Sequence, residues 1–501
     1  MLKGYEKYKS VNAFGMDKVP LQWNVKRTFS CLIENKKKNV EKEVTLLLQF
    51  KYGTIVPKKI QDAEKDDNKY EKYSIVHKGD IAINGLNLNY DFISQRVASV
   101  NTNGIITSAY LTFTPRKIDE QRYLVYLFKG LDGIKLFHGL GTGLRQTLTS
   151  DEVLKLQIPV PPKPEQDKIV QFLDWKISEM NHFIHQKKKQ IKLLEELKYT
   201  QIDQYITKGL NPSVSMKDSK VEWIGAIPEH WDVDHIKQHF KVKKRIAGKE
   251  GYDVLSITQQ GIKKKDISSN EGQMAQSYAN YQFVYPGDFA MNHMDLLTGY
   301  IDISKQFGVT SPDYRVFTLS DSEHCFAPFY LRVFQIGYKR KIFYKFGKGA
   351  ANQGRWRLQI TAFYEYAIQV PPIDEQREIA RQCDEVEKQI NEMISGINKE
   401  ITLVEELRTK LISDVVTGQV DVRNVKIPAY ETETDIIDSE EDSDEENQEF
   451  AEKLREQTKE KVCIVSAKTG AGIAELKEWM IRMVPEGFGG AGLGKTAMCV
   501  V

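Results

Sequence analysis

The sequence predicts an α+β protein: two mixed α/β domains in pseudo-twofold arrangement, separated by two long helices that form an antiparallel coiled coil. Three observations lead to this fold. The chain of 501 residues repeats itself at a displacement of about 210, each copy holds an α/β stretch and then a helical stretch, and the helical stretches align without a gap. The length suggests two to four domains. A hydrophobic content of 41% and a charged content of 28% exclude a disordered or collagen-like chain.

Short motifs that recur in the same order reveal the repeat. A Pro-Pro pair followed by Glu-Gln stands at Pro161 and again at Pro371. A Gly-rich block that contains an arginine also recurs, at 141–148 and 347–358. The other matches are Pro20 with Pro228, Trp23 with Trp231, Gly53 with Gly261, Gly79-Asp80 with Gly287-Asp288, Asn84 with Asn292, Ile169 with Ile379, Glu195-Glu196-Leu197 with Glu405-Glu406-Leu407, and Thr207 with Thr417. One scaffold is therefore present twice.

The copies differ between these motifs. Residues 90–140 and 298–345 barely resemble each other, so we expect one scaffold that carries two different variable surfaces. The predicted parts are an α/β domain at 1–158, a long helix at 159–210, a second α/β domain at 211–369, a second long helix at 370–422, an acidic disordered linker at 423–450 and a C-terminal appendage at 451–501.

Each helical stretch is expected to bury one narrow seam, because apolar residues recur at the three-and-four spacing of a helix. About forty residues at ~1.5 Å each give a helix of about 60 Å. Such a seam needs a partner, and we expect an antiparallel pair of the two copies with the α/β domains at opposite ends. The alternative is two unrelated surface helices. The predicted seam consists of Ile169, Leu173, Ile177, Met180, Ile184, Ile191, Leu194, Ile379, Cys383, Val386, Ile390, Met393, Ile397, Ile401, Val404, Leu411 and Val415.

The remaining residues are typical of mixed α/β domains. The clearest strand-like runs, rich in β-branched and aromatic residues, are 44–50, 110–113, 281–284 and 314–319. Gly-Asp pairs follow extended runs in both copies and fit tight turns with a positive φ at the glycine. We interpret Asp80 and Asp288 in these pairs as structural rather than catalytic.

Charge is distributed unevenly along the chain. It holds 71 basic and 69 acidic residues, but ten of the sixteen residues from Glu431 to Glu446 are acidic. Residues 431–501 contain 17 acidic and 8 basic residues, which leaves 63 basic and 52 acidic residues and a net charge of +11 in 1–430. A basic body fits a nucleic-acid partner, although many cytosolic proteins carry a similar charge.

The sequence offers no signal for a membrane or for a metal centre. No run approaches the ~18 consecutive apolar residues of a membrane helix, and residues 1–10 lack an apolar signal core, so we expect a cytoplasmic protein. The cysteines are isolated, without a Cys-x-x-Cys pair or a histidine at zinc-finger spacing. They predict neither a disulfide framework nor a structural zinc. They are Cys31, Cys325, Cys383, Cys463 and Cys499.

These motifs together resemble a known family. A basic α/β domain that closes with a Gly-rich, Arg-containing turn, runs through Pro-Pro and Glu-Gln into a long helix and then repeats is similar to the DNA specificity subunit of Type I restriction-modification enzymes. The stretch 221–233, with Trp223-Ile224-Gly225 and Trp231, resembles the start of that family's second recognition domain. The resemblance covers residues 15 to about 422. The first copy departs from it, because it lacks the Trp-x-Gly lead-in.

The resemblance implies that each α/β domain is a target-recognition domain that reads one part of a bipartite site in double-stranded DNA. It also implies that the helices set the spacer and dock two methylation subunits, and through them restriction subunits. The chain itself would be non-catalytic, and S-adenosylmethionine, ATP and Mg²⁺ would bind to the partner subunits. The alternative is the specificity subunit of a related single-complex restriction enzyme.

The residues themselves also predict no catalytic or metal-binding site. The chain contains no His-Glu-x-x-His and no Asn-Pro-Pro-aromatic motif. The histidine pairs at helical spacing are His182 with His185 and His235 with His239, and we expect them to be exposed rather than metal-binding.

Basic clusters are the candidates for DNA contacts, because Lys and Arg bind phosphates and Arg, Lys, Asn and Gln read base edges. Arg145 and Arg355 recur in equivalent turns, where each is either a phosphate clamp or an ion pair that locks the turn to the helix start. A charge run is also often only a solvated face. The candidates are Lys36, Lys37, Lys38, Lys58, Lys59, Arg145, Lys243, Lys244, Arg245, Lys263, Lys264, Lys265, Lys339, Arg340, Lys341 and Arg355.

The appendage offers a rival function as a nucleotide-binding protein. Residues 489–496 fit the P-loop pattern, and 466–468 are similar to the guanine-side loop of GTPases. A P-loop needs a strand before it and a helix after it, but only 497–501 follow here, and no Asn-Lys-x-Asp motif precedes Ser466. We therefore interpret 451–501 as a truncated or fused remnant.

Overall fold

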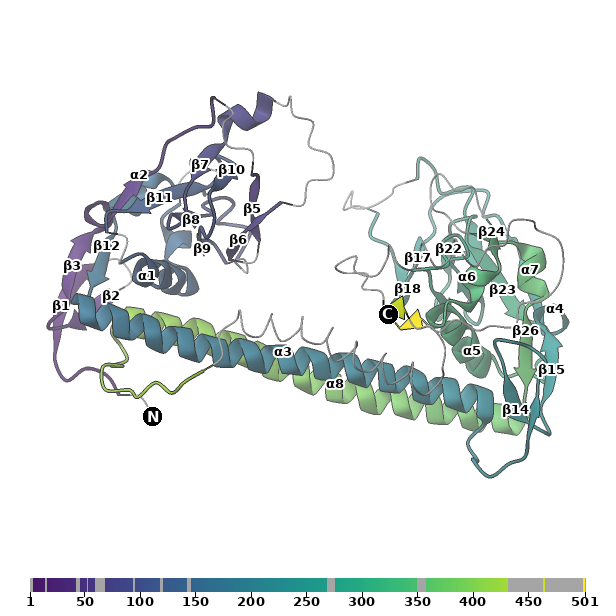
Figure 1. Cartoon of the computed structure of the whole chain (residues 1–501). Coiled ribbons are helices and arrows are strands. Elements are labelled where there is room, and N and C mark those ends of the chain that lie inside the picture. The colour runs from purple at the N-terminus through teal and green to yellow at the C-terminus, as the bar shows by residue number, and fades with distance from the viewer. Residues whose placement is uncertain are drawn as a thin grey trace. The chain divides into compact units, whose positions relative to one another are not determined.

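A computed structural model shows the chain (Figure 1). It describes residues 3–430 except 14–15, 42–45, 52, 59–67, 93–94, 118–119, 142–145, 268–274 and 349–356, and beyond 430 only the parallel pair β27 (Cys463–Ile464) and β28 (Cys499–Val500). The chain forms two compact units. Unit 1 combines residues up to 186 with those from 400 onward, and unit 2 is 187–399. Each long helix is thus divided between the units, because its two halves pack with different α/β domains.

Unit 1 begins with a β-rich domain that leads into the first long helix. In the parts of the unit that the structure describes, the elements are β1 (Tyr8–Ala13), β2 (Met16–Pro20), β3 (Asn24–Arg27), η1 (Thr28–Ser30), β4 (Leu32–Glu34), β5 (Leu48–Lys51), β6 (Thr54–Pro57), η2 (Asn68–Lys72), β7 (Ser74–Val76), β8 (Ile81–Ile83), β9 (Val97–Ser99), β10 (Gly104–Ile106), β11 (Leu111–Pro115), α1 (Gln121–Gly133), η4 (Leu136–Gly139), α2 (Ser150–Lys155), β12 (Gln157–Val160) and the start of α3 (Lys163–Lys208).

Unit 2 contains the end of α3 and repeats the same order of elements. They are β13 (Met216–Asp218), β14 (Ala226–Pro228), β15 (Asp232–His235), α4 (Ile236–His239), β16 (Phe240–Lys243), β17 (Leu255–Thr258), β18 (Gly261–Lys264), β19 (Gln282–Val284), β20 (Phe289–Met291), β21 (Ile301–Ile303), β22 (Gly308–Thr310), β23 (Arg315–Leu319), α5 (Ala327–Lys339), α6 (Ile342–Lys345), β24 (Gly347–Lys348), β25 (Arg357–Leu358), α7 (Ile360–Tyr364), β26 (Ala367–Val370) and α8 (Ile373–Val416), which continues into unit 1.

Both units contain the same antiparallel sheet. Its strand order is β4-β11-β8-β9 in unit 1 and β16-β23-β20-β21 in unit 2. One helix of 13 residues packs against each sheet, α1 in unit 1 and α5 in unit 2. The turn before the third strand holds Gly79 at φ +98° and Gly287 at φ +89°. Asp80 and Asp288 are buried there, and each carboxylate accepts a backbone N–H of its own turn. The predicted α+β fold, with one scaffold present twice, is confirmed.

A buried tryptophan joins each sheet domain to the start of a long helix. In unit 1 the Trp23 indole donates to Glu165 at 2.9 Å, and the Tyr5 hydroxyl donates to the same oxygen at 2.6 Å. In unit 2 the Trp231 indole donates to Glu375 at 3.0 Å. Both tryptophans are fully buried. The recurring Trp and the recurring Glu-Gln of the sequence are therefore two halves of one contact.

The end of the other long helix lies at the same contact. Gly209 follows α3 at φ +74° and Gly418 follows α8 at φ +76°, which is the left-handed conformation that ends many helices. A side chain at Gly209 would meet Trp231 and Glu375, and one at Gly418 would meet Pro20 and Trp23. Each unit therefore brings the start of one long helix to the end of the other.

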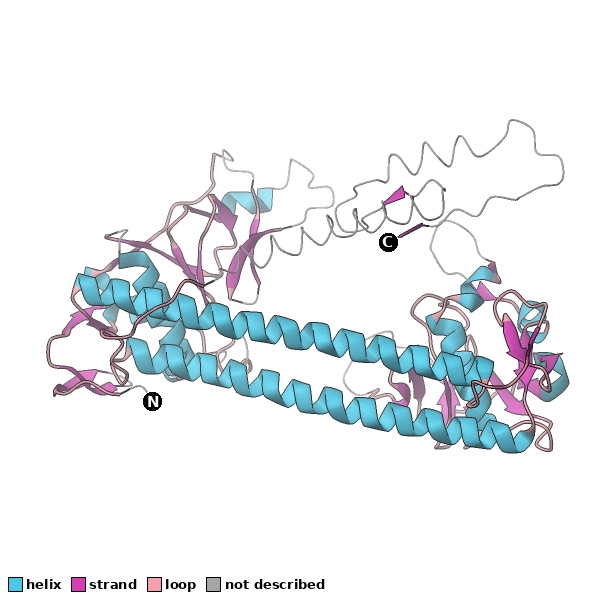
Figure 2. Cartoon of the chain, turned by 60° about the horizontal axis from the view of Figure 1, so that its bottom comes forward, coloured by secondary structure: helices cyan, strands magenta, loops and turns pink. Residues whose placement is uncertain are grey.

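The two long helices run antiparallel within each unit (Figure 1). In unit 1, Arg408 of α8 donates to Asn181 of α3 at 2.6 Å. In unit 2, Lys198 of α3 donates to Asn391 of α8 at 3.2 Å. Both helices are continuous, with 46 residues in α3 and 44 in α8 (Figure 2). Their starts at Lys163 and Ile373 follow strand and Pro-Pro residues that the predicted bounds 159–210 and 370–422 had included in the helices.

The seam on α8 differs from the prediction at one residue. Met393 is 55% exposed, whereas its neighbour Ile394 is half-buried. The observed seam takes two successive steps of four here, from Val386 to Ile390 and from Ile390 to Ile394, so Met393 lies one position to the side. Arg408 also occupies a seam position and is satisfied by Asn181. The α8 seam positions are Ile379, Cys383, Val386, Ile390, Ile394 and Ile397 in unit 2, and Ile401, Val404, Arg408, Leu411 and Val415 in unit 1.

We predict that Trp23→Phe destabilises unit 1, because it removes the indole donor from a buried carboxylate and leaves space beside it. The expected loss in free energy of unfolding is about 2–3 kcal/mol, measured by urea unfolding of the whole chain. Trp175→Phe is the matched control, since the Trp175 indole bonds Glu179 at the helix surface, and it should cost less than about 1 kcal/mol. Equal losses would contradict a special role for the buried contact.

Candidate nucleic-acid interface

The lysines predicted in unit 1 are exposed on the sheet domain. Lys36 forms an ion pair with Glu34 at 2.9 Å, and Lys38 donates to Ser74 at 3.0 Å. Lys37 and Lys58 are also exposed. Lys59 and Arg145 lie outside the described residues, so the choice between a phosphate clamp and an ion pair stays open for Arg145.

The cluster at 243–245 divides into two kinds of residue. Arg245 turns inward, pairs with the buried Asp288 and lies over the Tyr285 ring at 4.7 Å. It therefore helps to hold the Gly-Asp turn, and its role as a DNA contact stays a prediction. Lys243 is half-buried and Lys244 is exposed, and both line a hollow described below.

The other basic clusters of unit 2 are also held by neighbours. Lys263 donates to Gln260, and Lys264 pairs with Asp253 at 2.6 Å. Lys265 follows the β17–β18 hairpin that carries these two lysines. The hairpin therefore presents exposed ammonium groups that nearby side chains already hold in place.

The cluster at 339–341 lies against a long helix. Lys339 stands over the Tyr199 ring at 4.2 Å, and Arg340 pairs with Asp203 at 3.2 Å. Both partners belong to α3, so these two residues fasten α5 to α3. Lys341 begins α6 with a positive φ of 55°. Arg355 lies outside the described residues.

The recurring Gly-rich block docks on the sheet through the same hydrogen bond in both units. Leu148 N–H donates to the Gly85 carbonyl at 2.9 Å, and Leu358 N–H donates to the His293 carbonyl at 3.0 Å. Gly85 must stay small, because a side chain there would meet Leu148. At the equivalent place unit 2 carries the imidazole of His293. The backbone frame is shared, but the side chains in it differ.

A second difference stands beside the first. Leu111 pairs with Ile83 in the sheet of unit 1, and Arg315 pairs with Met291 at the same register in unit 2. The Arg315 side chain is 6% exposed, donates to the Leu358 carbonyl at 2.8 Å and lies over the Phe363 ring at 4.8 Å. Arg315 is not among the site residues predicted from the sequence. Its signal was a cation at a strand position that is leucine in the other copy.

Arg315 borders a hollow of about 140 Å³ at one edge of the sheet. The hollow lies where β16 and β20 end and β23 begins. Among the described residues, its lining contains cations and no carboxylate. The residues that line it are Val242, Lys243, Lys244, Gln282, His293, Pro312, Tyr314, Arg315 and Val316.

Burial lowers the pKa of two groups at this hollow. Burial, assisted by the nearby Arg315 and Arg357, lowers the pKa of His293 to about 3, so its imidazole is neutral at physiological pH. Burial also lowers the pKa of Arg315 to about 10, which leaves the guanidinium charged. The hollow therefore combines a neutral histidine with a buried cation.

The exposed apolar side chains of the long helices also repeat. Unit 1 exposes Phe183 of α3 with Leu403 and Leu407 of α8. Unit 2 exposes Met393 of α8 with Leu193 and Leu197 of α3. Each residue of the second set lies 210 positions from its counterpart in the first. Both units thus present the same three positions, which we call the apolar triplet.

A protein-family model described as the Type I restriction modification DNA specificity domain matches residues 33–193 and 228–403. The two matches contain most of both sheet domains and most of both long helices. The chain belongs to this family. Its sheet domains with their adjoining helix halves are therefore two copies of a specificity domain, and the resemblance seen in the sequence is confirmed.

Similar proteins agree with this assignment. The MjaVIII type I restriction enzyme specificity subunit of Methanocaldococcus jannaschii is 24% identical over 81% of this chain and 95% of its own. The putative MjaX type I specificity subunit of the same organism is 25% identical over 61% of this chain and 69% of its own. A solved chain from a study of assembly and conformational transition of the type I R-M system has a TM-score of 0.52 at 13% identity, over 80% of this chain and 99% of that one, and supports the fold.

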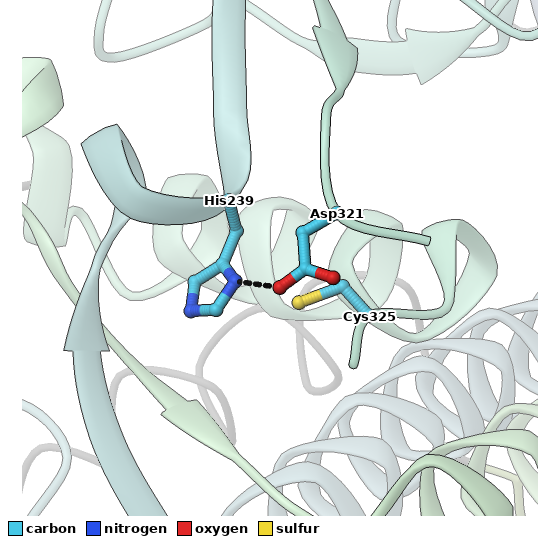
Figure 3. A group of neighbouring side chains, drawn as sticks. All are labelled: His239, Asp321 and Cys325. Carbon is cyan, nitrogen blue, oxygen red and sulfur yellow. Dashed lines mark hydrogen bonds and ion pairs between the residues drawn. The ribbon is translucent and has the colours of Figure 1, made fainter. Parts of the chain in front are cut away.

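The second specificity domain also contains a group of metal-ligand residue types, His239, Asp321 and Cys325 (Figure 3). His239 is 6% exposed, so the expectation that it is exposed was wrong; it ends α4, and Asp321 and Cys325 lie on the segment between β23 and α5. Its ring nitrogens face Asp321 at 3.0 Å and Asp234 at 2.8 Å. Burial raises the pKa of the Cys325 thiol to about 11, which favours a neutral S–H over a metal-binding thiolate. These hydrogen bonds connect the end of α4 to β15 and to the segment before α5.

Other sequence predictions have a simpler outcome. Cys31, Cys325 and Cys383 are free thiols. Within the described residues, no helix is long and apolar enough to cross a membrane. The P-loop-like residues 489–496, the loop at 466–468 and the acidic segment after 430 lie outside the described residues.

We predict that acid destabilises unit 2 through His293. Its pKa of about 3 lies below the usual 6.5, so the native imidazole resists a proton that the unfolded chain accepts. This contribution to stability is complete above pH 6.5 and is lost as the pH falls toward 3, by about 1 kcal/mol per pH unit. His293→Gln should flatten the decline between pH 7 and pH 5 in urea unfolding of the whole chain. His77→Gln, at an exposed site of unit 1, should not, and equal declines in parent and His293→Gln would contradict the assignment.

Proposed function

We propose that this chain is the DNA specificity subunit of a type I restriction-modification complex. Each specificity domain reads one half of a bipartite site in double-stranded DNA. The long helices set the spacer between the half-sites and dock two methylation subunits, through which restriction subunits join. The observation that supports this best is one sheet scaffold present twice, with different side chains in the same backbone frame, since a split site of two unlike halves requires two related but different readers.

The apolar triplets support the docking of two methylation subunits. Two identical partners need two equivalent surfaces, and the triplet positions recur 210 residues apart. Exposed leucines at i and i+4 lie on one side of a helix, so Leu193 with Leu197 and Leu403 with Leu407 form short apolar stripes. Such stripes fit the apolar side of a partner helix.

We further propose that the chain is non-catalytic and acts in the cytoplasm. S-adenosylmethionine, ATP and Mg²⁺ then belong to the methylation and restriction subunits. Among the DNA-contact candidates, Lys36, Lys37, Lys38, Lys58, Lys243, Lys244, Arg245, Lys263, Lys264, Lys265 and Lys341 remain, together with Lys59, Arg145 and Arg355. We assign Lys339 and Arg340 to the attachment of α5 instead, because their contacts are to α3.

Methylome sequencing of cells that express the chain with its methylation subunits tests this function. We expect methylated adenines in one bipartite motif. Replacing residues 1–158 with the matching domain of another specificity subunit should change one half of the motif, and replacing 221–368 should change the other. The parent chain and a chain with both domains replaced are the controls. A motif without two halves, or a single replacement that alters both halves, would overturn the proposal.

The triplets predict how assembly fails. The double variant Leu403→Glu/Leu407→Glu should lose one methylation subunit, and Leu193→Glu/Leu197→Glu should lose the other, because each removes roughly 3–5 kcal/mol of apolar contact. Native mass spectrometry of the assembled complex should show one methylation subunit per variant chain, with affinity at that surface reduced by roughly 10²–10³-fold.

The control for the triplets is Gln190→Glu/Ser395→Glu, which adds the same charge at exposed helix positions of unit 2. It should keep both methylation subunits. Complexes of unchanged composition in both leucine variants would show that the methylation subunits dock elsewhere.

A further inference from the structure

The hollow of the second specificity domain contains a buried positive charge without a counter-charge. Among the described residues Arg315 has no ion-pair partner, and its Nη1 atom has no hydrogen-bond acceptor. Its other contacts are the Leu358 carbonyl and the Phe363 ring. Burying an unpaired charge costs several kcal/mol, so such residues usually have a partner of opposite charge.

Two other arginines of the chain, Arg96 and Arg332, have an acidic partner, although the Nε of Arg96 also has no acceptor among the described residues. Arg96 is fully buried in unit 1, but it donates to the carbonyls of Asn84, Leu86 and Asp91 and lies 3.8 Å from the Asp91 carboxylate. Arg332 in unit 2 pairs with Asp384 at 2.7 Å and with Glu387 at 2.6 Å. Among the described residues, Arg315 donates to a single carbonyl, that of Leu358, and pairs with no carboxylate.

The surroundings of Arg315 favour an anion. Lys243 and Lys244 line the same hollow, and Lys243 lies opposite Val316, the residue that follows Arg315. The buried Nδ1 of His293 also has no partner among the described residues, and a neutral imidazole adds no opposing charge. A hollow of about 140 Å³ is large enough for a tetrahedral oxyanion.

We propose that this hollow binds a backbone phosphate of the DNA, with Arg315, Lys243 and Lys244 as the positive groups that hold it. The inference rests on the proposed function, which supplies the DNA. A phosphate fits better than a base edge, because three cations and no described carboxylate surround the space and a phosphodiester is the anion that every DNA sequence offers. The contact positions the duplex and leaves base selection to other side chains.

In the first specificity domain, the described residues do not form this site. Leu111 stands at the strand position of Arg315, and Gly85 stands at the position of His293. The Gly85 carbonyl accepts the Leu148 N–H, and a side chain at Gly85 would meet Leu148. The proposed phosphate contact therefore belongs to one half-site only. The two domains then bind their half-sites through different contacts on the same scaffold.

The experiment measures how salt affects the binding of the assembled methyltransferase complex to a duplex with its methylated motif. Arg315→Gln should weaken binding about tenfold near 0.15 M salt and reduce the slope of log affinity against log salt by about 1, since each phosphate contact contributes about 0.9 to that slope. Lys243→Gln should act in the same direction, and it decides the matter if Arg315→Gln does not fold. The methylated motif should stay unchanged in both variants.

Two controls separate this contact from general charge. Lys345→Gln removes one positive charge from the same domain, where Lys345 pairs with Glu222 at the surface, and it should leave the slope nearly unchanged. Inorganic phosphate at matched ionic strength should weaken DNA binding more in the parent than in Arg315→Gln, because only the parent uses the intact hollow to hold the DNA phosphate. Equal weakening in the parent and in Arg315→Gln would show that no DNA phosphate occupies the hollow and would overturn the proposal.

The other outcomes are equally distinct. An unchanged slope in both variants overturns the phosphate site but leaves the proposed function intact if the parent still methylates a bipartite motif. A changed motif with an unchanged slope shows base reading by Arg315 and also overturns the phosphate site. A parent complex that methylates no bipartite motif overturns the proposed function, and this inference falls with it.

Discussion

The hydrogen bond from a buried indole to a glutamate at a helix start is the contact on which the rest of each unit depends. An indole N–H deep in the core needs an acceptor, and the buried Glu165 and the half-buried Glu375 supply one to Trp23 and to Trp231. Each contact fixes three things at one point: the entry of the chain into the sheet domain, the first turn of one long helix, and the glycine that ends the other. The antiparallel pairing inside each unit follows from this junction.

A fixed junction permits variation elsewhere. The sheets of both units have the same strand order, and the Gly-rich block docks through the same backbone hydrogen bond, from Leu148 or from Leu358. Backbone contacts do not depend on side-chain identity, so the residues on the frame can change without loss of the fold. Gly85 and Leu111 in one unit, and His293 and Arg315 in the other, are such changes. Two domains on one scaffold can therefore present different chemistry to two half-sites.

Much of the fold was predictable from the sequence because it lies in local patterns. Helix periodicity, Gly-Asp turns and the recurring Pro-Pro and Glu-Gln motifs each act within a few residues. Met393 was misplaced because a 3.6-residue helix and a 3.5-residue seam differ by one position over several turns. The roles of Arg245 and Arg340 were not predictable, since their partners Asp288 and Asp203 lie 43 and 137 residues away. Arg315 escaped notice because a single cation in a β-rich run has no local signal.

Leu111 of unit 1 occupies the sheet position that Arg315 occupies in unit 2, and this comparison indicates what Arg315 does. Replacing buried charges by apolar residues is often neutral or stabilising, and unit 1 has such a residue at this point of the sheet. Unit 2 has a guanidinium there instead, at the first residue of β23, and one carbonyl and one aromatic ring hold it. A fold that tolerates leucine does not require the arginine for its own stability. The charge is therefore best explained by the DNA phosphate proposed above, and with Leu111 at the same point of the sheet unit 1 differs from unit 2 in this respect.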